Sequence, residues 1–149
     1  MLKLRYKRFF RYVPFLLWIG VIFFMSSNSG SMSNTSRFIR PLLEFLFPNS
    51  LPETLDVFHG YIRKLAHITE YAILAFFASR TFRSSSKYYF RRYWYLFAMI
   101  AVFAVASVDE YNQSFNQNRT GSIYDVLLDC FGGLLMICMV SLWFKIVKK

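Results

Sequence analysis

Long apolar stretches alternate with short polar stretches along the whole chain. Four apolar stretches have the length of a helix, at residues 9–25, 61–82, 93–108 and 123–147. Each is close to the roughly 20 residues that an α-helix needs to cross the hydrocarbon core of a bilayer. The pattern predicts an all-α, polytopic membrane protein with about four transmembrane helices, formed by residues 1–149 as a single domain.

A fifth apolar stretch lies between the first two. Residues 38–47 number only ten and include an arginine, a proline and a glutamate. Such a segment is too short to cross a bilayer, so we expect an interfacial or re-entrant helix between the first and second transmembrane helices. Residues 50–53 (SLPE) then resemble a capping box with proline in the first turn. They predict a separate short helix before the second span, with His59 in the loop that follows.

Composition and charge agree with a membrane protein. Hydrophobic residues make up 56% of the chain, aromatic residues make up 21%, and the net charge is +10. A soluble domain of this composition would lack polar surface. Lys and Arg concentrate before Val13, in residues 80–92 and after Phe144, whereas all acidic residues lie in 44–70 and 109–129. This alternation follows the positive-inside rule and predicts a multi-pass protein of the cell membrane with both termini in the cytoplasm. It does not indicate a nucleic-acid-binding face.

The predicted topology brings the unusual polar residues into one layer. The second helix runs from outside to inside, the third runs outward, and the fourth runs inward. The ionisable residues that this topology places at the outer ends are Lys64, His67, Glu70, Asp109, Glu110, Asp125 and Asp129. Carboxylates within membrane segments are costly unless they are paired, hydrated or functional.

Helical spacing groups these residues into faces. Lys64, His67 and Tyr71 share one face, with Glu70 on its flank. Asp109 and Gln113 share another if the third helix continues past the membrane boundary, and Asp125, Asp129 and Gly132 share a third, where glycine permits close helix approach. The facing sides predict an outer polar pocket. Its acid–base candidates are His67, Glu70 and Asp109, and its predicted ligand-binding residues are Arg63, Lys64, Tyr71, Glu110, Gln113, Arg119, Asp125 and Asp129.

Two further uses of the polar residues carry less weight. His67, Glu70, Asp109, Asp125 and Asp129 are chemically suited to a divalent metal, but no HExxH or comparable signature is present, so we predict neither a metal nor another cofactor. Ion or proton translocation needs polar residues along the whole path. The inner halves of the predicted helices are mainly apolar, so translocation ranks last.

Three stretches of the sequence also resemble a known family. They are residues 26–30 (SSNSG), residues 63–71 with Arg63, Lys64, His67, Glu70 and Tyr71, and residues 109–127 with Asp109, Glu110, Gln113, Phe115, Arg119, Gly121, Ser122 and Asp125. In order and spacing they are similar to the VanZ-like family of small bacterial membrane proteins, named for an accessory protein linked to low-level teicoplanin resistance. The chain differs at Asp129, where the family often has asparagine.

The resemblance implies a polytopic membrane protein associated with the cell envelope. Our leading hypothesis is that the polar pocket binds or modifies an amphiphile: a membrane lipid, a lipid-linked cell-wall precursor or a lipoglycopeptide of the teicoplanin type. The alternative is a non-enzymatic structural or interaction module, with envelope proteins as partners, in which the polar residues only hold the helices in register.

Overall fold

The structure is a computed structural model that describes residues 2–27, 32–115 and 121–147. Within these ranges it contains six α-helices and no strand, which confirms the all-α prediction. The helices are α1 (Leu2–Ser26), α2 (Met32–Leu46), α3 (Pro52–Arg83), α4 (Tyr88–Arg92), α5 (Trp94–Ser114) and α6 (Ile123–Val147).

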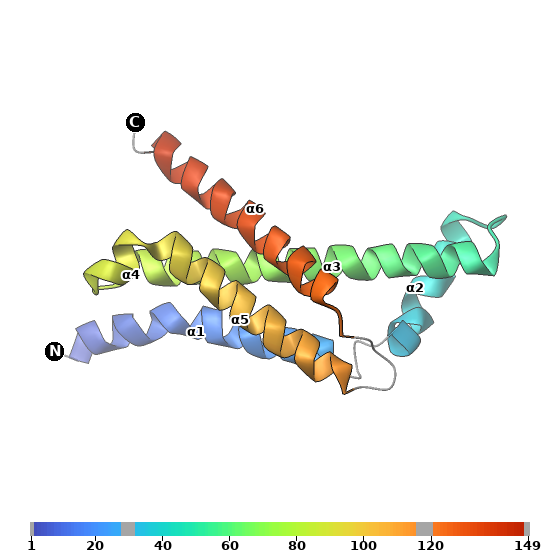
Figure 1. Ribbon diagram of the computed structural model, residues 1–149, viewed down its shortest axis with the longest axis horizontal. Helices are drawn as coiled ribbons and strands as arrows, with labels where there is room; N and C mark the ends of the chain where they lie inside the picture. Colours follow the sequence, from blue (N-terminus) through green and yellow to red (C-terminus); the bar gives the residue numbers. More distant parts are fainter. Residues whose placement is uncertain (1, 28–31, 116–120, 148–149) are drawn as a thin grey trace.

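Helix α3 organises the fold. Its 32 residues correspond to about 48 Å at roughly 1.5 Å per residue, and it contacts α1, α2, α4, α5 and α6. Figure 1 shows α3 running the length of the molecule, with α2 at one end and α4 at the other. The start of α1 and the end of α6 both lie at the α4 end. We call this the terminal end, and the other the α2 end.

The prediction of a separate short helix before the second span is wrong. Residues 52–83 form one continuous helix, and the predicted capping box does not form, because Leu51 is the N-cap in an extended conformation without a side-chain cap. Proline in the first helical turn is compatible with this start. Gly60 does not interrupt the helix. Helices α1 and α5 are also longer than predicted, since α1 begins at Leu2 and α5 ends at Ser114.

Helix α2 packs on the first part of α3. It starts at Met32, earlier than the predicted short helix, and Leu43 of α2 and Leu55 of α3 are both buried. His59, predicted to lie in a loop, is instead a buried residue of α3. Its Nε2 lies 3.1 Å from Thr35 Oγ1 and its Nδ1 lies 3.2 Å from Ser36 Oγ. These contacts join α2 to α3 ahead of the predicted span 61–82.

Acid is expected to loosen this α2–α3 contact. Burial lowers the pKa of His59 below its usual 6.5, the nearby Arg63 adds to this, and Asp56 opposes it. The unfolded state therefore binds more protons than the folded state just below pH 6.5, so stability is lost as the pH falls through this window. Hydrogen exchange of α2 amides, corrected for intrinsic pH dependence, should accelerate on acidification. A His59→Gln variant should show no such acceleration, and equal pH dependence in both proteins would contradict the prediction.

Small residues allow α3, α5 and α6 to approach closely. A Cβ added to Gly132 of α6 would meet the backbone carbonyl oxygen of Ile68 in α3, and one added to Gly133 would lie 2.8 Å from Val102 Cγ1 in α5. The predicted role of these glycines in close packing is therefore confirmed. Buried alanines line the same core: Ala75 and Ala78 of α3, and Ala98 and Ala106 of α5.

The apolar surface is consistent with a membrane protein. Among the described residues, α5 and α6 are long and apolar enough to cross a membrane, and the apolar part of α1, Phe10–Ser26, is shorter. Polar residues such as His67 and Glu70 interrupt the apolar stretch of α3 and lower its hydropathy. Large apolar side chains are exposed on several helices, including Leu16, Leu17, Ile100, Phe103 and Leu142.

Candidate functional site

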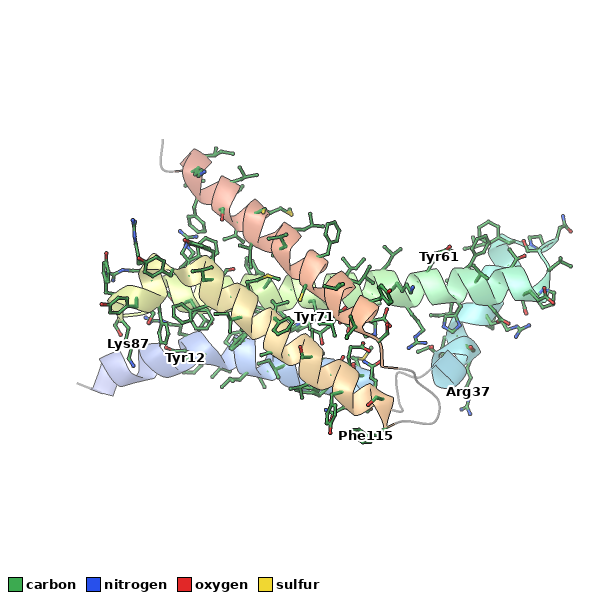
Figure 2. All side chains as sticks on the ribbon, viewed as in Figure 1. Tyr12, Arg37, Tyr61, Tyr71, Lys87 and Phe115 are labelled. Atoms are coloured by element: carbon green, nitrogen blue, oxygen red, sulfur yellow. The ribbon has the colours of Figure 1, made fainter. Side chains whose placement is uncertain are left out.

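Asp109 of α5 is the centre of a buried hydrogen-bond network. Its side chain is fully buried, and its Oδ2 accepts hydrogen bonds from Ser26 Oγ at 2.6 Å, Gln113 Nε2 at 2.9 Å and Tyr71 OH at 3.2 Å. These donors come from α1, α5 and α3. Figure 2 shows Tyr71 in the middle of the bundle, where α5 passes α3. We call these four residues the Asp109 network, and it ties three helices together.

The network forms because α5 continues past the predicted end of its span. Asp109 and Gln113 lie one turn apart on α5, which extends to Ser114, so the predicted i, i+4 pairing is confirmed. Ser26 is the last residue of α1. A hydroxyl at a helix end can turn back into the bundle, and Ser26 also accepts from Gln113 Nε2 at 3.3 Å. The predicted first helix, 9–25, ends one residue before Ser26, so the sequence did not reveal this role.

A second polar group lies beside the Asp109 network. His67 of α3, Glu110 of α5 and Asp129 of α6 each offer a ligand atom, and these atoms lie within 4.8 Å of one another. His67 Nδ1 is 3.7 Å from Asp129 Oδ1. The Asp129 side chain is fully buried, and neither of its oxygens has a hydrogen-bond partner among the described residues. We call these three residues the His67–Glu110–Asp129 cluster.

The start of α6 fixes the position of Glu110. The backbone N–H of Ser122 donates to Glu110 Oε2 at 2.9 Å. Gly121 lies so close to α5 that an added Cβ would meet the backbone carbonyl oxygen of Glu110. Ser122, which the sequence singled out only as part of the family resemblance, therefore orients Glu110 through its backbone N–H.

The surroundings of Asp129 are acidic. Its carboxylate experiences the charges of four other acids: Glu110, Asp109, Asp125 and Glu70. The basic residues predicted to oppose them do not do so within the described ranges. Arg63 is half-buried, Lys64 is exposed, and neither forms an ion pair there; the described arginine pairs are those of Arg40 with Glu44 and Asp56. The predicted residue Arg119 lies outside the described residues.

The chain also matches a known protein family. A family model described as VanZ/LLP1 matches residues 10–144. The chain belongs to the VanZ/LLP1 family. This match covers both polar groups and confirms the resemblance seen in the sequence. No curated protein and no solved structure was found to match the chain.

The VanZ/LLP1 fold brings together six of the predicted site residues: His67, Tyr71, Asp109, Glu110, Gln113 and Asp129. Lys64 is exposed and forms no ion pair among the described residues, and Asp125 is half-buried at the start of α6. Glu70 is half-buried on the flank of α3, and its backbone carbonyl accepts a hydrogen bond from Trp18 Nε1 at 2.9 Å. The indole of Trp18 is a contact that the sequence did not reveal.

The VanZ/LLP1 chain also has a separate crevice between α3 and α6. Its volume is about 650 Å³, and it lies towards the terminal end, where its walls include Phe76, Met139 and Trp143. Arg80 and Arg83 supply the charge at its edge. This crevice is mainly apolar and involves none of the predicted site residues, so it is distinct from the predicted polar pocket.

Proposed function

We propose that this VanZ/LLP1 protein is an integral membrane protein of the cell envelope whose helices α1, α3, α5 and α6 all cross the membrane. Support comes from their lengths and from the exposed apolar side chains between their ends. Basic residues of α3, α4 and α6 gather at the terminal end, including Arg83, Arg91, Arg92 and Lys145. By the positive-inside rule, this end and both termini face the cytoplasm. The two polar groups then lie towards the outer leaflet.

We further propose that the outer polar groups bind or modify the head group of an amphiphile. The candidates are a membrane lipid, a lipid-linked cell-wall precursor and a lipoglycopeptide of the teicoplanin type. The observation that carries this proposal is Asp129, a fully buried carboxylate with no hydrogen-bond donor among the described residues. A buried acceptor left without a partner costs about 1–3 kcal/mol. Asp109 also has one unpartnered oxygen, Oδ1, but its Oδ2 accepts three hydrogen bonds, whereas both oxygens of Asp129 lack a partner among the described residues. This difference supports a binding role for Asp129.

The two polar groups suit different roles. Asp109 Oδ2 already accepts three hydrogen bonds, so Asp109 is suited to positioning helices rather than to exchanging a proton. His67 lies 3.7 Å from Asp129 and is the better candidate for acid–base chemistry on a bound head group. Arg63 lies one turn before His67 on α3, next to Lys64. Both are suited to contact a phosphate at the rim.

Exchanging Glu110 for glutamine should abolish function without loss of protein. Gln keeps the shape of the side chain and removes its charge. In a teicoplanin-susceptible bacterial host, the wild-type chain should raise the minimal inhibitory concentration of teicoplanin or change the lipid composition measured by mass spectrometry. Glu110→Gln and His67→Gln should remove this effect at unchanged abundance on an immunoblot.

Asp56→Asn, at an exposed side chain of α3, is the matched control and should behave as the wild type. Full activity of Glu110→Gln and His67→Gln at normal abundance would contradict the proposal. So would a wild-type chain that changes neither susceptibility nor lipids.

The Asp109 network favours the second candidate function, a structural or interaction module for other envelope proteins. It joins α1, α3 and α5 through one carboxylate oxygen. If the polar residues only hold the helices in register, variants of both polar groups will lose phenotype in proportion to their loss of abundance. A stable but inactive Glu110→Gln variant separates the two functions.

A further inference from the structure

The geometry of the His67–Glu110–Asp129 cluster resembles that of a metal site. An imidazole and two carboxylates converge from three helices, with their ligand atoms within 4.8 Å of one another. Two atoms bound to one tetrahedral ion at about 2.0–2.2 Å lie roughly 3.3–3.6 Å apart. The three side chains would have to close in by about 1 Å to share one ion.

Asp129 supplies an independent reason to expect a cation. Both of its oxygens are buried and lack a hydrogen-bond partner among the described residues, although Oδ1 points towards His67 Nδ1 at 3.7 Å. This distance is too long for a hydrogen bond. Four further acids add their negative charge at this position. Buried charges are usually paired or coordinate a metal.

The contacts around the cluster are those of a supported ligand set. The Ser122 N–H donates to Glu110 Oε2 and orients that carboxylate, as partners behind metal ligands commonly do. Gly132 lies one turn after Asp129 on α6 and lets this helix lie directly against Ile68, the residue after His67. The close approach of the two helices is what brings His67 and Asp129 together.

We propose that His67, Glu110 and Asp129 bind one divalent transition-metal ion, with Zn²⁺ the best match. One imidazole nitrogen and carboxylate oxygens suit Zn²⁺, whereas Mg²⁺ and Ca²⁺ prefer oxygen ligands alone. Three protein ligands leave a coordination position for water or for an oxygen of a bound head group. The ligand set differs from the one considered from sequence, because Glu110 rather than Asp109 faces His67. The site does not depend on the proposed amphiphile binding.

The test uses tag-free, full-length protein in mild detergent, stripped of metal with a chelator. Titration with ZnCl₂ alone, followed by elemental analysis, should give one bound ion per chain, and added Zn²⁺ should raise the thermal unfolding midpoint. Asp129→Asn and His67→Gln should each weaken Zn²⁺ binding by at least about tenfold and lose the rise in midpoint. Asp56→Asn should retain both.

Replacement of Zn²⁺ by Co²⁺ provides a second measurement, made on the wild-type protein, that does not depend on variant stability. The wild-type protein should give the visible absorption of Co²⁺ bound by nitrogen and oxygen. The proposal is overturned if wild-type protein binds no Zn²⁺, or if both cluster variants bind it as tightly as the wild type. Metal binding without any effect on teicoplanin or lipids would uphold the site and count against the proposed function.

Discussion

Replacing Asp109 with alanine should lower stability by about 3–5 kcal/mol. The change leaves the hydroxyls of Ser26 and Tyr71 and the amide of Gln113 without their shared acceptor inside the bundle. Each hydrogen bond to a charged group contributes about 1.5–3 kcal/mol, and each stranded donor adds a desolvation cost. Removal of the buried charge offsets part of this loss. In a protein of this size the net effect corresponds to a fall of roughly 10 °C in the unfolding midpoint, measured by tryptophan fluorescence in detergent.

A graded series makes this prediction specific. Asp109→Asn keeps one side-chain oxygen as an acceptor and should lose less stability than Asp109→Ala. Tyr71→Phe removes only the longest of the three hydrogen bonds and should lose least, about 1–2 kcal/mol. Asp125→Asn, at a half-buried position outside the network, serves as the control. An unchanged midpoint for Asp109→Ala would contradict a helix-joining role for this carboxylate.

The helices with long apolar runs could be predicted from the sequence, whereas the helical segments of mixed polarity could not. The bounds predicted for the last helix, 123–147, agree with α6 because its apolar run is long and flanked by polar residues. Residues 52–60 are mixed in polarity and have no clear helical period of their own. They are helical because α3 continues through them and α2 covers Leu55 and His59. Such tertiary packing outweighs local signals.

The site was predictable along each helix but not between helices. Spacing correctly paired Asp109 with Gln113 and identified the close-packing face of α6. It could not tell whether Asp109 or Glu110 would face His67, because adjacent residues on a helix point about 100° apart. That choice depends on how α5 is rotated against α3. The contribution of Ser26 depends on where α1 ends, which a serine-rich boundary leaves undefined.

Gly132→Ala should disturb both the fold and the His67–Glu110–Asp129 cluster. An added methyl group at this position meets the backbone of α3 at Ile68, with the Ile68 Cα only 3.1 Å away. Backbone cannot move aside as a side chain can, so α6 must shift away from α3. Overpacking of this kind costs about 1–3 kcal/mol, and the backbone contact favours the upper end. Asp129, one turn away, shifts with the helix, so Zn²⁺ affinity should fall together with the unfolding midpoint.

Two other glycines provide matched comparisons for Gly132→Ala. Gly133→Ala meets the side chain of Val102 at 2.8 Å, which can adjust, so its effect should be smaller. Gly20→Ala, on α1, adds a methyl group with nothing within 4 Å and should not lower stability. Alanine also has the higher helix propensity, so any loss at Gly132 arises from packing alone. If Gly132→Ala and Gly20→Ala have equal midpoints, α6 does not lie against Ile68 as described. The approach of Gly132 to Ile68 would then not be what brings His67 close to Asp129.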